Sequence, residues 1–285
     1  MPEPVKIHVH DLHKSFGSKV VLDGVNVDIV PAESLVIIGG SGTGKSVLLK
    51  HVIGLLKPDS GTVEVDGQAV EKLGNRQITE FRRKFGMAFQ EGALFDSMTV
   101  WQNVAFPLQR LTKMSHGEID DRVEECLSMV RLEGVGEKLP SQLSGGMRRR
   151  VGFARAVAHQ PEILLFDEPT TGLDPITTAL IDEIILDLSD RLKTTSVTIT
   201  HDMESAYRIA DRIAMLDRGK IIAEAPPKEF QRLDDPRVQQ FIHGRADGPL
   251  SEEAPARGPR DSRDETGSTN EGEKPGAGAR ELERS

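Results

Sequence analysis

The strongest constraint on the fold is a glycine-rich loop between an apolar run and a helical stretch. Residues 34–38 form a short apolar run typical of a buried parallel strand. They are followed by Gly39-Gly-Ser-Gly-Thr-Gly-Lys-Ser46, which fits the pattern G-x-x-x-x-G-K-[ST], and then by an apolar helix. Strand, loop and helix in this order are the context that a phosphate-binding P-loop requires. The sequence therefore predicts an α/β protein built around a nucleotide phosphate site.

The residue types in this loop follow from the chemistry of phosphate binding. Backbone N–H groups must approach phosphate oxygens closely, which side chains would obstruct, and the helix N-terminus adds a favourable dipole. We expect Lys45 to supply charge at the β- and γ-phosphates, and the Ser46 hydroxyl to ligate Mg²⁺. Glycine-rich turns without nucleotide also occur, but the Lys-Ser pair and both flanking elements argue against that alternative. The predicted nucleotide-binding residues of this segment are Gly39, Gly40, Ser41, Gly42, Thr43, Gly44, Lys45, Ser46 and Val47.

Strand and helix signals alternate along the rest of the chain, with no internal repeat. Two β-branched runs near a polar turn predict an antiparallel layer, at residues 5–9 and 20–29. Buried parallel strands are predicted at residues 34–38, 162–166 and 195–200. Helices are predicted at residues 45–56, 115–131, 144–159 and 175–192.

Composition limits the class of protein. The 285 residues are 37% hydrophobic and 28% charged, as in ordinary globular enzymes. The net charge of −9 disfavours nucleic acid as a partner without excluding it. The single cysteine, Cys126, can form neither an internal disulfide nor a Cys-rich zinc site. No apolar run approaches the ~18 residues that cross a bilayer, so no membrane span is expected.

The composition changes near residue 245. Residues 245–285 contain no aromatic residue, no Ile and no Val, and are therefore predicted to be mostly disordered. The folded domain is accordingly placed at residues 1–244. Residues 241–250 keep apolar groups at both ends, which is compatible with an ordered arm or with a frayed terminus.

A second part of the nucleotide site is predicted at the end of the apolar run Ile163-Leu-Leu-Phe-Asp-Glu168. We expect Asp167 to hold Mg²⁺, usually through a water. We expect Glu168 to direct its carboxylate at an attacking water and to act as general base. Because acidic residues after a strand are often only turn formers, this prediction depends on the pairing with the Lys45 loop.

The segment Leu143-Ser-Gly-Gly-Met147 narrows the class of P-loop protein. Ser144 is a good N-cap, and a capped helix preceded by glycines can bind an anion, although read alone it is only a helix start. With this segment ahead of the strand that carries Asp167, the chain resembles the ATP-binding cassette (ABC) family. The resemblance implies a P-loop NTPase fold with an ABC-type nucleotide-binding domain, an antiparallel β subdomain and an inserted helical subdomain at about residues 91–160. It also implies ATP hydrolysis in a head-to-tail homodimer, in which Ser144, Gly145 and Gly146 close on ATP held by the other subunit.

Other positions match the family in order along the chain. Gln90 resembles the Q-loop glutamine, which links Mg²⁺ and the attacking water to the transmembrane partner. Asp174 resembles the D-loop residue at the subunit junction, and His201 resembles the switch histidine that contacts the γ-phosphate. Phe16 stands where many members stack a tyrosine on adenine, and Met147 replaces the usual Gln of the signature. The resemblance thus implies Glu168, His201 and Gln90 as catalytic residues and Ser46, Gln90 and Asp167 as metal ligands.

The short helical segment between Gln90 and Ser144 favours a transporter subunit over family members that act on DNA or ribosomes. In transporters, the apolar region at residues 91–108 forms the groove that receives the permease's cytoplasmic coupling helix, although core packing explains some of these residues as well. A soluble ABC ATPase that acts on nucleic acid or ribosomes is the alternative of a different class.

Several short phrases resemble the Mla/Mce-type lipid-transport ATPases. They are Gly92-Ala-Leu-Phe-Asp96, Asn103-Val-Ala-Phe-Pro-Leu108, the Leu-Ser-Gly-Gly-Met-Arg-Arg-Arg signature and Gly244-Arg-Ala-Asp-Gly-Pro249. This resemblance implies an ATPase dimer on the cytoplasmic face of the bacterial inner membrane. Its partners would be an integral-membrane permease dimer, a periplasmic lipid-binding MCE-type ring and often a small STAS-domain protein, with no nucleic acid. The cargo would be phospholipid moving between the inner membrane and the outer envelope, and residues 241–250 would reach across the dimer. A transporter for another cargo is the alternative within the same class.

Overall fold

The structure is a computed structural model that describes residues 5–90 and 92–251. The strands of these residues form two sheets. The larger sheet has six strands in the order β10-β9-β3-β8-β7-β6, of which β10 is antiparallel and the others are parallel. The smaller sheet has four antiparallel strands in the order β2-β1-β4-β5. The predicted α/β fold with an antiparallel layer is confirmed.

The bounds of the elements are as follows. The strands are β1 (Ile7–Phe16), β2 (Lys19–Ile29), β3 (Ser34–Ile38), β4 (Ser60–Val65), β5 (Gln68–Ala69), β6 (Phe85–Ala88), β7 (Ile163–Asp167), β8 (Thr195–Thr200), β9 (Arg212–Asp217) and β10 (Lys220–Ala225). The helices are α1 (Lys45–Val52), α2 (Asn75–Arg82), α3 (Val100–Leu111), α4 (His116–Met129), α5 (Gly145–Val157), α6 (Pro175–Leu192), α7 (Met203–Ile209), α8 (Pro227–Phe230) and α9 (Pro236–Ile242). Two short 3₁₀ turns are η1 (Val70–Lys72) and η2 (Pro140–Gln142).

The central strand β3 separates two hydrophobic cores. Successive side chains of a strand point to opposite faces of its sheet. Leu35 and Ile37 accordingly pack into the core shared with α1 and the antiparallel sheet. Val36 and Ile38 pack into the other core, together with residues of α3, α4, α5 and α6. All five residues of β3 are buried, which explains why this segment reads as a continuous apolar run.

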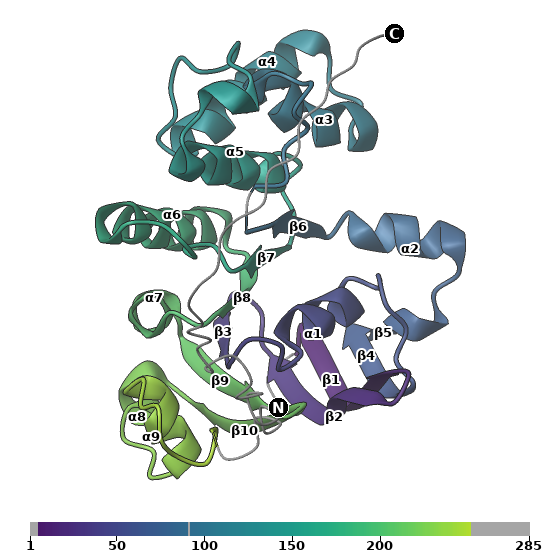
Figure 1. Ribbon diagram of the computed structural model, residues 1–285. Coiled ribbons are helices and arrows are strands. Elements are labelled where there is room, and N and C mark those ends of the chain that lie inside the picture. The colour runs from purple at the N-terminus through teal and green to yellow at the C-terminus, as the bar shows by residue number, and fades with distance from the viewer. Residues whose placement is uncertain (1–4, 91, 252–285) are drawn as a thin grey trace, which may run out of the picture.

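Helices α3, α4 and α5 lie together at one end of the molecule, beyond β6 (Figure 1). Ser115 caps α4 and Ser144 caps α5, because each hydroxyl accepts a hydrogen bond from a backbone N–H three residues later. Within the described part of the chain, no helix is long and apolar enough to cross a membrane.

The predicted helix at residues 45–56 was too long. Helix α1 ends at Val52, and Gly54 adopts a left-handed conformation with a φ of 68°. The N–H groups of Leu55 and Leu56 then bond back to the Lys50 carbonyl, which closes the helix end. The predicted strand at residues 5–9 was too short, since β1 continues to Phe16.

The segment after α9 contacts Gln240 of α9 and the turn between β9 and β10. The buried Gln240 side chain accepts a hydrogen bond from the Leu250 N–H at 2.7 Å and donates to the Arg245 carbonyl at 3.2 Å. Arg218, in the turn between β9 and β10, donates to the Pro249 carbonyl at 3.1 Å. Residues 252–285, which make up most of the predicted tail, lie outside the described residues.

Candidate active site

The glycine loop connects β3 to α1 through backbone conformations that side chains would block. Gly39 has a φ of 153°, and a Cβ atom placed there would lie 2.3 Å from the Leu216 carbonyl oxygen. Gly44, which precedes the first residue of α1, has a φ of 108° and lies against β2 in the same way. The loop therefore wraps tightly over the sheet edge and directs the N-terminus of α1 at the space in front of it.

Lys45 is folded back over this loop. Its ammonium group donates hydrogen bonds to the carbonyls of Gly39 at 2.7 Å and Gly40 at 2.9 Å, and the residue is only 7% exposed. Burial lowers the pKa of Lys45, while the nearby carboxylates of Glu168 and Asp167 oppose that shift. The site thus places a buried ammonium group beside two carboxylates, with Glu168 Oε1 at 3.8 Å.

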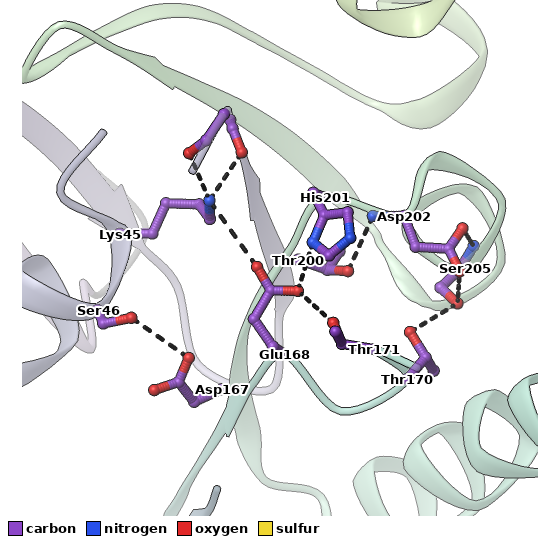
Figure 2. A network of polar contacts seen from close by, with 12 residues as sticks. Lys45, Ser46, Asp167, Glu168, Thr170, Thr171, Thr200, His201, Asp202 and Ser205 are labelled. Carbon is purple, nitrogen blue, oxygen red and sulfur yellow. Dashed lines mark hydrogen bonds and ion pairs between the residues drawn. The ribbon is translucent and has the colours of Figure 1, made fainter. Parts of the chain in front are cut away.

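The two acidic residues at the end of β7, Asp167 and Glu168, point in different directions (Figure 2). Asp167 accepts a hydrogen bond from the Ser46 hydroxyl at 3.3 Å, and burial raises the pKa of its carboxyl group. Glu168 has a left-handed φ of 50°, and its N–H donates to the Ile199 carbonyl at 2.9 Å. This turn sends one carboxylate toward the Ser46 hydroxyl and the other toward the Lys45 ammonium.

The Glu168 carboxylate is the centre of a small polar network. Its Oε2 atom accepts a hydrogen bond from the Thr171 hydroxyl at 2.8 Å and lies 2.8 Å from His201 Nδ1. Its Oε1 atom lies 3.8 Å from the Lys45 Nζ atom. The carboxylate is therefore oriented by groups from three separate segments of the chain, which Figure 2 shows converging on it.

These groups face a cavity of about 740 Å³. Eleven of the residues predicted from the sequence line it: Phe16, Ser41, Gly42, Gly44, Lys45, Ser46, Val47, Gln90, Asp167, Glu168 and His201. The others predicted from the sequence do not: Gly39, Gly40, Thr43, Ser144, Gly145, Gly146 and Asp174. Gly39, Gly40 and Thr43 belong to the loop itself, where the Thr43 hydroxyl donates to the Gly40 carbonyl at 3.0 Å.

The remaining four predicted residues gather at a second place, where the N-termini of α5 and α6 meet. Ser144 caps α5 by accepting a hydrogen bond from the Met147 N–H at 3.2 Å. A Cβ atom at Gly146 would lie 2.7 Å from a methyl group of Thr177. The Thr177 hydroxyl donates to Asp174 at 2.6 Å, and this bond lowers the pKa of Asp174. Two helix N-termini therefore lie side by side, outside the cavity that holds Lys45.

The oxygen donors at the cavity fit a magnesium ion that is also bound by phosphate. The Ser46 hydroxyl, the Gln90 amide and the Asp167 carboxylate all line it, and Mg²⁺ prefers such oxygen ligands. Within residues 5–90 and 92–251, no group of three or more His, Cys, Asp and Glu side chains could hold a metal. Mg²⁺ is usually bound through one or two carboxylates together with substrate phosphates and water.

Some residues of the site were not among those predicted from the sequence. Thr171 lines the cavity and holds Glu168, and it could have been found because it lies three residues after that glutamate. Lys19 and Val21 line the cavity next to Phe16, at the start of β2. Arg149 contacts the backbone of both Gln90 and Thr171. No signal in the sequence distinguishes it from its neighbours Arg148 and Arg150.

Comparison with known proteins assigns the family. A family model described as ABC transporter matches residues 22–171. The chain belongs to the ABC transporter family. It is 42% identical to the probable ribonucleotide transport ATP-binding protein mkl of Mycobacterium leprae, over 88% of this chain and 72% of the relative. It is 39% identical to the intermembrane phospholipid transport system ATP-binding protein MlaF of Haemophilus influenzae, over 88% of this chain and 95% of the relative.

Solved structures support the same assignment. This chain aligns with the ATP-binding cassette MJ0796, whose structure was solved as a dimer in a post-hydrolysis state bound to ADP and Pi. The TM-score is 0.72 at 34% identity, and the match covers 78% of this chain and 98% of that one. The resemblance to the ABC ATPases that the sequence suggested is therefore confirmed, and so is the P-loop cassette fold. The protein is an ABC-type ATPase, the ATP-binding subunit of a transporter.

Proposed function

We propose that two copies of this ABC ATPase bind and hydrolyse Mg-ATP between them and thereby drive a permease that moves phospholipid between the inner membrane and the outer envelope. The observation that supports ATP hydrolysis between two copies is that the predicted site residues lie in two separate places on one chain. Lys45, Ser46, Asp167 and Glu168 line one cavity, whereas Ser144 and its neighbours do not line it. A head-to-tail pair of subunits would bring the second group against the first group of the other copy.

Several polar side chains of the cavity have a proposed role in hydrolysis. Lys45, whose ammonium group lies at the cavity, neutralises the β- and γ-phosphates. Ser46, Gln90 and Asp167 would hold Mg²⁺, which when bound neutralises charge on the phosphate oxygens. Glu168 accepts a proton from the attacking water, and its orientation is fixed by the Thr171 hydroxyl.

Two further contacts are proposed. His201, at Oε2 of the same carboxylate, is close enough to reach the γ-phosphate when nucleotide enters. Phe16 is proposed to stack on the adenine, since its ring is 49% exposed at the rim of the cavity. In the other subunit, Ser144, Gly145 and Gly146 present the capped N-terminus of α5 to the γ-phosphate, and Asp174 lies at the junction.

An apolar groove next to the Gln90 loop supports a permease as partner. Its volume is about 340 Å³, and its lining includes Phe89, Phe95 and Phe106. Phe89 and Phe95 are 39% and 42% exposed, so the groove presents two large apolar side chains to solvent. Arg155, whose pKa is lowered by burial, lies over the Phe95 ring and adds one positive charge to the groove. Such a surface would accept a short amphipathic helix of the membrane subunit.

The cargo is proposed from the relatives and from the sequence phrases that resemble Mla/Mce-type ATPases. The match to the MlaF of H. influenzae spans 95% of that protein, and it is named for intermembrane phospholipid transport. A periplasmic MCE-type ring and a small STAS-domain protein belong to the same proposal, as does a position on the cytoplasmic face of the inner membrane. The name of the M. leprae relative makes a ribonucleotide the competing cargo.

The domain boundaries, and an arm formed by residues 241–250, are proposed as they are predicted from the sequence. The cassette occupies residues 1–244, with the helical subdomain at about residues 91–160. Residues 241–250 are proposed to extend across the dimer, although within one subunit they contact Gln240 and Arg218.

Affinity capture of the full chain from detergent-solubilised membranes tests this proposal. Mass spectrometry should identify an integral permease and co-purifying phospholipid. Capture of a ribonucleotide transporter, or salt-sensitive binding to nucleic acid without a permease, would refute the lipid assignment.

A pair of matched variants tests the groove. Phe95→Asp should abolish capture of the permease and leave ATP binding intact. Leu186→Asp is the control, because Leu186 has the same 42% exposure on the surface of α6. Equal capture by both variants would show that the groove is not the permease surface.

A further inference from the structure

Arg149 joins the two loops on either side of the reacting groups. It lies in the second turn of α5, the helix that Ser144 caps, and is 8% exposed. Its Nε–H donates to the Gln90 carbonyl at 2.5 Å, and an Nη2 N–H donates to the Thr171 carbonyl. One guanidinium therefore holds the backbone of the Gln90 loop and the backbone of the loop that follows Glu168.

The second of these contacts leads directly to the carboxylate. Arg149 fixes the main chain of Thr171, and the Thr171 hydroxyl donates to Glu168 Oε2 at 2.8 Å. A planar guanidinium can donate to two acceptors in a fixed relative orientation, which a lysine ammonium does not impose. The position of Glu168 is thus tied to α5 through two hydrogen bonds in series.

The Gln90 loop is tied to the same helix in a second way. A Cβ atom at Gly92 would lie 2.6 Å from the Arg148 carbonyl oxygen, so this loop lies directly on the α5 backbone. Arg155 donates to the carbonyls of Gly92 and Ala93, each at 2.8 Å. The loop is therefore packed on the helix, and Arg149 extends these contacts to the loop that follows Glu168.

We propose that Arg149 is a positioning residue that couples the placement of α5 to the orientation of Glu168 and Gln90. When Ser144 at the start of α5 engages nucleotide, the guanidinium transmits that placement to both loops and sets the carboxylate for hydrolysis. Arg149 does not line the nucleotide cavity, so it acts on turnover and not on nucleotide affinity. The inference concerns ATP hydrolysis and does not depend on which cargo is moved.

Three variants of the full chain test the proposal in the assembly that hydrolyses ATP. Arg149→Met removes all donors but keeps an unbranched apolar chain in place of the aliphatic part of the arginine. Arg149→Lys keeps the charge without the planar pair of donors. Arg150→Met is the control, because Arg150 also donates to a main-chain carbonyl, that of Arg131 at 2.8 Å, but ties α5 to the end of α4.

We expect Arg149→Met to lower kcat by about 100-fold, the effect of a small misplacement of reacting groups, with the Kd for ATP unchanged. Arg149→Lys should restore part of kcat, and Arg150→Met should leave kcat at the wild-type value even if its Tm falls. A purely structural role would instead lower Tm in both Met variants and leave kcat of the folded enzyme unchanged. That result, or an equal loss of kcat in both, would overturn the proposal.

Combining Arg149→Lys with Thr171→Val gives a second measurement, which does not require the Arg149→Met variant to fold. Thr171→Val removes the hydroxyl that joins Arg149's contact to Glu168. If the two residues act in series, Arg149→Lys should have a smaller effect on kcat in the Thr171→Val background than in the wild type. Equal effects in the two backgrounds would contradict the coupling.

Discussion

Replacing Lys45 with Met is expected to weaken ATP binding about 10- to 150-fold. The lysine ammonium has three N–H donors, and two of them go to the carbonyls of Gly39 and Gly40. One donor is left for a phosphate oxygen in the cavity. A hydrogen bond to a charged group contributes about 1.5–3 kcal/mol, and each 1.4 kcal/mol is about a factor of ten in Kd, which gives the stated range.

The same substitution has an expected effect on stability without nucleotide. Because the pKa of Lys45 is lowered from 10.5 by burial, the unfolded chain still holds the proton in a pH window where the folded chain has lost it. The contribution of this residue to the free energy of unfolding therefore rises with pH across that window, which lies just below 10.5. Lys45→Met should remove this rise.

Isothermal titration calorimetry with Mg-ATP at neutral pH measures the first effect, and urea unfolding at several pH values measures the second. Lys57→Met is the matched control, since Lys57 is exposed in the turn after α1. A Kd for Lys45→Met within twofold of the wild type would refute the assignment of Lys45 as a phosphate ligand. So would an equal loss of affinity in the control.

Three further predictions concern other parts of the molecule. Glu168→Gln should keep ATP binding but lower turnover about 10²–10⁴-fold, because the amide still accepts the Thr171 hydroxyl but cannot take a proton; unchanged phosphate release would remove Glu168 from its role. Ser144→Ala should lower the free energy of unfolding by about 1 kcal/mol through loss of the N-cap, whereas Ser144→Asp should keep it, and equal urea midpoints for the two variants would count against the cap. Burial raises the pKa of Cys126 to about 11, so at mildly alkaline pH a thiol reagent should label it only in the unfolded chain. Rapid labelling under native conditions would contradict the buried position.

The core strands and the nucleotide loop could be predicted from the sequence because their signals are local. Residues 34–38 and 195–200 read as strands since both faces are buried, and the structure has the same bounds. Helix α6 was predicted to its exact ends because Pro175 follows the Asp174 cap. The end of α1 was missed, since the left-handed conformation of Gly54 depends on contacts of the turn with the rest of the fold.

The features that organise the site depend on long-range contacts and could not be predicted. Arg148, Arg149 and Arg150 are the same residue type at consecutive positions, yet their guanidinium groups reach different places. Arg148 donates to the Leu143 carbonyl just ahead of its own helix, Arg149 to the two loops of the active site, and Arg150 to the end of α4. The left-handed backbone of Glu168 is likewise set by its bond to β8, 31 residues further along the chain.

The association state of the Glu168→Gln variant in Mg-ATP tests the central claim most directly. This variant should trap bound nucleotide, so sedimentation should give a dimer that forms with Mg-ATP and dissociates when nucleotide is removed. The double variant Lys45→Met/Glu168→Gln should stay monomeric at the same nucleotide concentration. A Glu168→Gln chain that remains monomeric in saturating Mg-ATP, even with its permease present, would contradict a site shared between two copies.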